Sequence, residues 1–348
     1  MAAESSRLAI IGAGIAGMTA ARLWQDRGLS VRLFDKGRNI GGRCATRRRD
    51  ELAFDHGVPA IAATDGDFRW AMRRWMMAAT LQRWRGSMQG FPEGLRLFTG
   101  TPDMNAIPAR LGAGLDIAQR VEVARVERKP DSGWHLHDAD GAALGRFDAV
   151  LLTCPLAQAQ RLLQPGLNAG WVDPDWFDRP VRMRAVWTVM AAFESRVASP
   201  HDAMVLDGEP LEFALRNSSK PERMSAQENW VLHAAPDITE QFLDHPKEAV
   251  VEDFLAALAY HLDTPLPRVI FARAHRWLYA RAEATGASEP DGTATTTSAQ
   301  RSLFDPETGL GLAGDWLNPP ASPFLGVQSA WLSGRDIGRR LRDWVRRR

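Results

Sequence analysis

Three glycines near the start of the chain constrain its fold more than any other feature. They stand in the run Gly12-Ala-Gly14-Ile-Ala-Gly17, which follows the apolar stretch Leu8-Ala-Ile-Ile11 and opens a helical pattern that extends to about Arg27. A strand, a tight glycine turn and a helix in this order direct backbone N–H groups and the positive end of the helix toward one point. The pattern therefore predicts a Rossmann-type unit that holds the pyrophosphate of a dinucleotide.

Each residue of this motif has an expected role. Gly12 permits the tight turn, Gly14 lets the backbone approach the pyrophosphate, and Gly17 lets the helix pack closely on the strand. Asp35 follows at the end of the second predicted strand, which begins at Ser30. A carboxylate in this position accepts hydrogen bonds from ribose hydroxyls. Together these residues favour a dinucleotide site over a glycine turn without a ligand.

The motif alone does not separate NAD from FAD, because both carry an adenosine ribose and a pyrophosphate. The run Arg38-Asn-Ile-Gly41-Gly42-Arg43 adds paired glycines and a fixed cation after the second strand. Near the C-terminus, Gly314-Asp315-Trp316 precedes a helix predicted from Val327. The carboxylate can bind ribityl hydroxyls, and the positive helix end can stabilise the negative charge of a reduced flavin. These segments favour FAD.

The rest of the chain predicts an α/β fold with a mostly parallel central sheet, followed by a mixed part with longer strands. The polar stretch 282–300 lacks periodicity, and we expect it to be a mobile surface loop. Helices are predicted at 107–111, 249–262 and 327–344, and strands at 121–127, 133–138, 149–153, 186–193, 212–215, 230–233 and 310–313.

Composition excludes several classes of protein. Lysine and arginine number 43 and aspartate and glutamate 42, a formal charge of +1, which argues against a nucleic-acid or membrane-surface partner. Cys44 and Cys154 are too few for a disulfide framework or a cysteine-based zinc site. The apolar stretch 8–21 is too short to span a bilayer. We expect a cytoplasmic, metal-free protein that binds a small molecule and is a monomer or homodimer.

The chain resembles the two-domain FAD oxidoreductases of the amine-oxidase type, and most closely the renalases, especially their bacterial members. The runs Asn217-Ser-Ser-Lys-Pro-Glu-Arg223 and His275-Arg-Trp-Leu-Tyr-Ala-Arg281 are the most diagnostic. The stretches 34–38, 41–43 and 314–315 also carry the resemblance, but many flavoproteins share them. Further matches are at 54–57, 316 and 330–334.

The resemblance implies a Rossmann-type FAD-binding domain (5–50, 101–165 and 302–348) interleaved with an α+β substrate domain (51–100 and 166–301). It also implies non-covalent FAD and the oxidation of misreduced nicotinamide dinucleotides, the 2- and 6-dihydro isomers of NAD(P)H. Hydride would pass to flavin N5, and O2 would reoxidise the flavin to give H2O2. The nitrogen lone pair of a dihydropyridine expels hydride without a general base, so the protein is expected mainly to position the reactants.

The chain departs from the renalase pattern near the expected flavin face. Gly57-Val58-Pro59-Ala60 replaces a usual Gly-Ala-Gln-Tyr run, and Gln328 stands where a glutamate is common. The turn over 317–326 is also longer. These changes bear on the substrate rather than on the cofactor.

We predict His275, Arg216, Asn217 and Trp316 as the residues that act on the substrate. A structural histidine between domains is the alternative for His275, and a hydrogen-bonded strand end is the alternative for Arg216 and Asn217. The residues predicted to bind FAD are Gly12, Gly14, Ala16, Gly17, Asp35, Lys36, Gly42, Arg43, Val123, Gly314, Asp315 and Val327.

Two other functions stay open. An amine oxidase would use the same hydride chemistry, commonly with a lysine near flavin N5 and an aromatic cage. The chain has only four lysines, and its two tyrosines are Tyr260, inside a predicted helix, and Tyr279, so a two-tyrosine cage is hard to build. A flavin-bearing binding protein without turnover is the alternative from another class, because the segment 58–60 lacks the usual polar groups.

Overall fold

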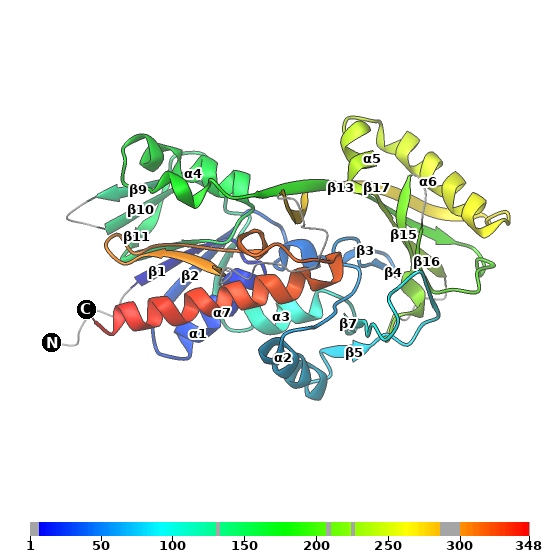
Figure 1. Cartoon of the computed structure of the whole chain (residues 1–348), viewed down its shortest axis with the longest axis horizontal. Coiled ribbons are helices and arrows are strands. Elements are labelled where there is room, and N and C mark those ends of the chain that lie inside the picture. Colours follow the sequence, from blue (N-terminus) through cyan, green and yellow to red (C-terminus); the bar gives the residue numbers. More distant parts are fainter. Residues whose placement is uncertain (1–6, 130–132, 207–209, 224–226, 286–299, 348) are drawn as a thin grey trace, which may run out of the picture.

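A computed structural model gives the fold, and it describes residues 7–129, 133–206, 210–223, 227–285 and 300–347. Figure 1 shows two lobes, each built around a β-sheet. The long strands β13 (Val181–Phe193) and β17 (Val269–Ala284) run between them. Helix α7 (Gly326–Val345) lies beside α1 (Ile15–Gln25) in the first lobe, and α6 (Lys247–Leu262) covers the second.

The sheet of the first lobe is mostly parallel, as predicted. Only β18 is antiparallel to its neighbour among the described strands of this sheet. The strand order is β18 (Ser302–Asp305), β19 (Leu310–Ala313), β12 (Ala149–Leu152), β1 (Arg7–Ile11), β2 (Ser30–Asp35) and β8 (Asp116–Gln119).

Both faces of this sheet are buried, which explains the continuous apolar runs of its central strands. Leu8 and Ile10 of β1 face the core beneath α1 and α7, whereas Ala9 and Ile11 face the opposite core. That second core is closed by α4 (Leu156–Asn168) and by a small sheet of β9 (Val123–Lys129), β10 (Gly133–Asp138) and β11 (Ala143–Phe147).

The second lobe contains a largely antiparallel sheet. Helices α5 (Pro236–Gln241) and α6 pack on one face of it, and residues around Phe54 and Ala60 pack on the other. The strand order is β17, β13, β16 (Glu228–Ala234), β15 (Leu211–Arg216), β14 (Ala203–Val205) and β6 (Met88–Gln89).

Strand β17 corrects the sequence prediction most. The stretch 282–284, expected to begin a mobile loop, continues β17 because it pairs with residues 181–183 of β13. Residues 286–299 of that predicted loop lie outside the described residues. The register shifts where Arg184 pairs with Arg281 and Val186 pairs with Trp277, so residues 278–280 of β17 lie opposite the single residue 185 of β13. Such bulges redirect side chains and are frequent beside active sites.

The remaining described elements are short strands, two helices and several 3₁₀ turns. Helix α2 is capped by Asp65, whose carboxylate accepts hydrogen bonds from the N–H groups of Asp67 and Phe68. None of the described helices is long and apolar enough to cross a membrane. The bounds are β3 (Arg47–Arg49), β4 (Leu52–Phe54), α2 (Gly66–Met77), β5 (Leu81–Arg83), β7 (Phe98–Gly100) and α3 (Ala106–Gly112), with 3₁₀ turns η1 (Gly42–Cys44), η2 (Pro174–Trp176), η3 (Asn217–Ser219), η4 (Asp315–Leu317) and η5 (Pro323–Leu325).

The division into two interleaved domains is kept as a proposal. The parallel sheet draws its strands from 7–35, 116–152 and 302–313, and the antiparallel sheet draws its strands from 88–89 and 181–284. The chain therefore crosses between the sheets several times, and this interleaving places segments distant in sequence around one cavity.

Candidate active site

A cavity of about 1040 Å³ lies at the carboxyl edge of the parallel sheet. Residues that follow β1, β2, β12 and β19 line one side of it, and residues 276–283 of β17 line another. This edge is where open α/β sheets bind their ligands. The volume lies at the upper end of the usual range for ligand pockets, which suits an extended dinucleotide.

The glycine motif lies on one side of the cavity, which we call its floor. Gly12 has a φ of 112°, which favours glycine, and its N–H donates to the carbonyl of Phe34 at 2.8 Å. Gly14 lines the cavity, and a Cβ added there would meet no atom within 4 Å. Gly17 does not line the cavity. It packs directly against the backbone, since a Cβ there would overlap the carbonyl oxygen of Gly12. Gly17 therefore serves helix packing, and Gly14 leaves space for a ligand.

Asp35 organises the next part of the floor. Its Oδ2 accepts a hydrogen bond from the N–H of Ala13 at 2.7 Å, and its Oδ1 accepts one from the N–H of Gly37 at 2.7 Å. Each carboxylate oxygen keeps acceptor capacity for a ribose hydroxyl. Lys36 lies beside it in the lining and pairs with Glu122 at 3.8 Å.

Arg43 and Asp315 bind each other, although they are 272 residues apart. Both guanidinium NH groups reach the carboxylate at 2.7 Å, and NH1 also donates to the carbonyl of Ala280 at 3.1 Å. Burial alone would lower the pKa of the Arg43 guanidinium, but Asp315 raises the pKa above its ordinary value. Arg43 and Asp315 thus form one bidentate pair, and Arg43 also holds the backbone of the β17 bulge at Ala280.

Among the described helices, α1, α4 and α7 begin at the cavity, and α1 and α7 do so beside the glycine motif and Asp315. Helix α1 follows Gly14 and α7 begins with Gly326 and Val327, and neither helix start has a side-chain cap. Their free N–H groups and positive ends suit a pyrophosphate at α1 and an electron-rich ring edge at α7. The open space over Gly14 and the acceptor Asp35 complete a set of residues that fits FAD.

Comparison with known proteins supports this conclusion. Residues 10–75 match the NAD(P)-binding Rossmann-like domain, and residues 76–341 match the flavin-containing amine oxidoreductases. The chain belongs to the flavin-containing amine oxidoreductase family. The predicted fold, flavin cofactor and oxidoreductase class are thereby confirmed at the level of the family.

The relatives of this amine oxidoreductase differ in their named activities. It is 41% identical over 68 residues to an L-amino-acid oxidase of Siganus canaliculatus, and 36% identical over 59 residues to a 4,4'-diapophytoene desaturase of Staphylococcus aureus. These matches span 19% and 17% of the chain, but only 13% and 12% of the relatives. A solved structure described as a candidate protoporphyrinogen oxidase, from Exiguobacterium sp. 255-15, has a TM-score of 0.75 at 14% identity, covering 97% of this chain and 98% of its own. That similarity shows the fold alone.

The residues predicted to bind FAD and those predicted to act on the substrate lie in different places. The cavity lining includes Gly12, Gly14, Ala16, Asp35, Lys36, Gly42, Arg43, Val123, Gly314, Asp315 and Val327. By contrast, His275, Arg216, Asn217 and Trp316 are absent from the described residues that line it. Trp316 is 1% exposed, and its Nε1 donates to the carbonyl of Cys154 at 3.2 Å. It packs in the core behind the site.

Arg216 occupies the strand end that was the alternative to a functional role. Its guanidinium donates to Glu228 at 2.8 Å, to Asp202 at 2.9 Å and to the carbonyl of Val197 at 2.9 Å. The residue is 2% exposed. The guanidinium of Arg216 is therefore fully engaged in a buried network at the end of β15. Arg216 is not among the described residues that line the cavity.

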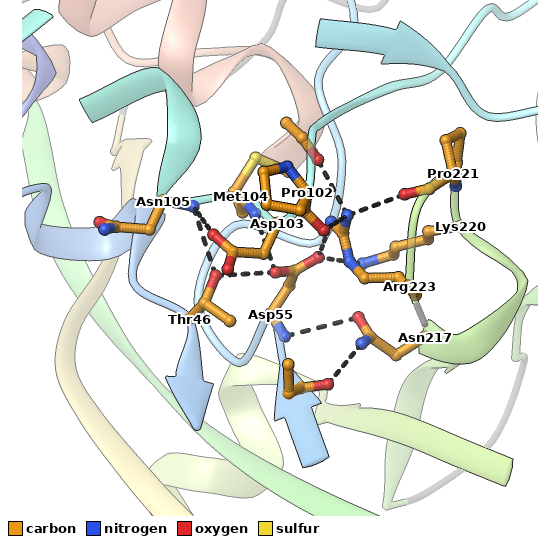
Figure 2. A network of polar contacts seen from close by, with 12 residues as sticks. Thr46, Asp55, Pro102, Asp103, Met104, Asn105, Asn217, Lys220, Pro221 and Arg223 are labelled. Carbon is orange, nitrogen blue, oxygen red and sulfur yellow. Dashed lines mark hydrogen bonds and ion pairs between the residues drawn. The ribbon is translucent and has the colours of Figure 1, made fainter. Parts of the chain in front are cut away.

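Asn217 belongs to a buried network centred on Asp55, which Figure 2 shows. The amide of Asn217 donates to the carbonyl of Ala53 at 2.8 Å. Asp55 accepts hydrogen bonds from Lys220 at 3.2 Å and from Arg223 at 2.5 Å on one oxygen. Burial alone would raise the pKa of Asp55, but these two cations hold that pKa well below its usual range.

The other oxygen of Asp55 accepts from Thr46 at 2.9 Å and from the N–H of Met104 at 3.0 Å. Burial lowers the pKa of the Lys220 ammonium to about 8. The run 217–223, the diagnostic run of the sequence, thus clamps three distant segments together and does not reach the cavity.

His275 lies behind the cavity wall. Its ring is 4.6 Å from that of Trp277 and 5.1 Å from that of His56, and Trp277 donates to the carbonyl of His56 at 2.9 Å. Burial lowers the pKa of both histidines to about 4, and the positive charge of Arg47 adds to this. Trp277 itself lines the cavity. The histidines are thus placed to support Trp277, not to contact a ligand.

Several lining residues were not predicted to bind anything. They are Glu212 and, along the bulge of β17, Arg276, Leu278, Tyr279, Arg281 and Glu283. A strand prediction for 269–284 would have indicated that Trp277, Tyr279 and Arg281 share a face. Cys44 and Cys154 also line the cavity, and burial raises the pKa of each thiol to about 12, which keeps both thiols protonated.

Proposed function

We propose that this amine oxidoreductase is a renalase-like oxidase that removes hydride from a misreduced dihydronicotinamide dinucleotide. The observation that carries the proposal is the composition of the wall opposite the glycine floor. That wall contains the aromatic residues Trp277 and Tyr279 together with the cation Arg281. Among the described lining residues the only lysine is Lys36, on the floor beside Asp35. Such a wall can hold a planar ring, and it offers no lysine for proton transfer.

The reaction asks little acid–base chemistry of the protein. When bound, FAD supplies the hydride acceptor and passes the electrons to O2. The balance is dihydro-NAD(P), O2 and one proton giving NAD(P)⁺ and H2O2. Because the ring nitrogen lone pair drives hydride loss, the side chains need only orient the ring and exclude water. Trp277 and Tyr279 supply flat surfaces, and Pro320 and Pro323 of the long turn close another side of the cavity.

An amine substrate is the second candidate, because the family match carries that chemistry in its name. The positions of the lysines and tyrosines weigh against the usual arrangement. Lys220 is fully buried against Asp55, and Tyr260 is 83% exposed on α6. Neither residue is among the described residues that line the cavity, so a lysine beside the flavin and a cage of two tyrosines are not formed.

The test is anaerobic stopped-flow mixing of the flavin-loaded protein with 2-, 4- and 6-dihydro-NAD(P), following the flavin absorbance. We expect rapid bleaching with the 2- or 6-isomers and none with ordinary NAD(P)H. Bleaching by an amine, an L-amino acid or protoporphyrinogen, without bleaching by any dihydronicotinamide, would contradict the proposal. Absence of bleaching by every compound would favour a flavin-bearing protein without turnover.

A further inference from the structure

The wall of the cavity contains a charged pair that the proposed reaction does not use. Arg281 of β17 and Glu212 of β15 both line the cavity, and NH1 of Arg281 is 2.6 Å from Oε2 of Glu212. Their side chains are 15% and 26% exposed. An ion pair that is mostly buried costs desolvation free energy, so its position facing a ligand cavity calls for an explanation.

The strand segment that carries Arg281 is anchored to residues on the cofactor side of the cavity. Ala280, next to Arg281, accepts a hydrogen bond from Arg43, and Arg43 is held by Asp315 directly after β19. The register shift of β17 occurs between Trp277 and Arg281, so the bulge sets both side chains at the wall. Arg281 therefore stands on the same strand segment as Trp277, and that segment is tied through Arg43 to Asp315.

Both members of the pair keep unused hydrogen-bonding capacity. In the described part of the chain, Arg281 contacts Glu212 through NH1 and lies over the Phe213 ring at 5.5 Å, while its Nε and NH2 groups have no acceptor. The Oε2 atom of Glu212 is buried and, apart from its ion pair with Arg281, has no hydrogen-bond donor in the described part of the chain. The pair thus offers N–H donors and a carboxylate acceptor side by side.

A primary carboxamide is the group that complements this arrangement. Its carbonyl accepts from a guanidinium, and its NH2 donates to a carboxylate. A phosphate or carboxylate suits the site less, because Glu212 and the neighbouring Glu283 would repel it. We propose that Glu212 and Arg281 bind the carboxamide of the dihydronicotinamide ring. This inference rests on the proposed function, and it assigns the contact with the substrate to Glu212 and Arg281, whereas the sequence analysis named Arg216 and Asn217 among the residues that act on the substrate.

The test compares three dinucleotides that differ only at this group. Calorimetry of the flavin-loaded protein gives dissociation constants for NAD⁺ (carboxamide), its 3-acetylpyridine analogue (no N–H donor) and its nicotinic acid analogue (carboxylate). The wild type should bind NAD⁺ roughly 10- to 100-fold more tightly than the acetyl analogue, as expected for one hydrogen bond to a charged group. Glu212→Leu should abolish this preference and improve binding of the carboxylate analogue.

Two further variants make the result decisive. Glu194→Leu removes an exposed carboxylate that pairs with Arg268 outside the cavity, and it should keep the wild-type preference. Glu212→Gln, which retains an acceptor without charge, serves if Glu212→Leu does not fold, and it should show a reduced preference. Equal binding of NAD⁺ and the acetyl analogue by the wild type, or an unchanged preference in the Glu212 variants, would overturn the inference.

Kinetics separate this inference from the proposed function. If the 2- or 6-dihydro isomer bleaches the wild-type flavin but the Glu212 variants keep the carboxamide preference, the reaction stands and the assignment of the pair fails. If no isomer bleaches the wild type, the proposed function fails, and the inference that rests on it fails too. With both correct, Glu212→Leu should raise KM for the carboxamide substrate by about tenfold or more and leave KM for the acetyl analogue unchanged.

Discussion

Gly14 and Gly17 show how two glycines of one motif serve different needs. A side chain at Gly14 would extend into the cavity without touching protein, whereas a Cβ at Gly17 would overlap the carbonyl oxygen of Gly12. We expect Gly14→Val to fold with nearly wild-type stability and to lose FAD, because the side chain fills the space of the pyrophosphate. Circular dichroism and visible absorbance after purification measure the two effects.

Gly17→Ala is the matched comparison. Overpacking against backbone costs about 1–3 kcal/mol of unfolding free energy, and more where the backbone cannot move. This variant should be clearly destabilised even without FAD. A yellow, folded Gly14→Val protein would contradict the placement of the cofactor, and a Gly17→Ala protein as stable as wild type would contradict the packing argument.

His56 should make stability depend on pH. Burial and the charges of His275 and Arg47 lower its pKa from 6.5 to about 4. Between those values the unfolded chain binds a proton that the folded chain does not, so the unfolding free energy falls as the pH falls from about 6.5 to about 4. The full contribution is about 3 kcal/mol for a shift of this size. His56→Phe removes this titration.

Urea unfolding at several pH values measures this effect. The difference in unfolding free energy between wild type and His56→Phe should be constant above pH 7. As the pH approaches 4, the wild type should lose stability relative to the variant. Parallel curves for the two proteins would show that the folded protein binds a proton at His56 as readily as the unfolded chain does.

At the scale of elements, Gln328 joins the start of α7 to the start of α2. Its Oε1 accepts from the N–H groups of Thr64 at 2.8 Å and Asp65 at 2.9 Å, and its Nε2 donates to the Thr64 hydroxyl at 2.9 Å. The sequence placed Gln328 near the flavin face, but it is not among the described residues that line the cavity. Its role is to hold the loop that caps α2.

Gln328→Ala should therefore lower the unfolding free energy by about 1–3 kcal/mol, because two N–H groups lose their acceptor. Gln164→Ala on the exposed side of α4 is the control and should change stability by less than about 0.5 kcal/mol. Gln328→Glu keeps the acceptor but adds a charge near Asp65, so its loss of stability relative to wild type should be larger at neutral pH than at acidic pH. A Gln328→Ala protein that matches the control in a urea titration would show that the tether contributes nothing.

At the scale of the whole molecule, the Asp55 network joins the residue after β4, the loop before α3 and the turn after β15 (Figure 2). Lys220 and Asp55 are both fully buried. Asp55→Asn leaves two buried cations without their counter-ion. We expect a loss of about 3–5 kcal/mol of unfolding free energy, as is typical when one partner of a buried ion pair is removed.

The double variant Asp55→Asn with Lys220→Met is the control for charge. Removing one of the two cations should restore part of the loss, and a double-mutant cycle from urea unfolding measures the coupling. Additive effects of the two substitutions would show that the ion pair does not couple the segments. Because the His56–Val58 segment directly follows Asp55 and Val58 lines the cavity, weakened FAD retention should accompany the loss of stability.

The sequence by itself determined the parts of this protein that rest on local backbone needs. A turn at Gly12, an open approach at Gly14 and an acceptor at the end of β2 depend on residues close in sequence, so the motif predicted the cofactor floor. The apolar strands of the parallel sheet and the long helices also follow from local patterns of hydrophobicity.

Only the tertiary structure decided how charged side chains are paired. Arg43 meets Asp315 across 272 residues, and Arg281 meets Glu212 because β17 and β15 belong to the same sheet and a bulge turns Arg281 toward the cavity. The same topology buries Arg216 and Asn217 in structural networks and places His275 behind Trp277. Such partners depend on strand order and register, and the local sequence does not encode which distant carboxylate a given arginine will meet.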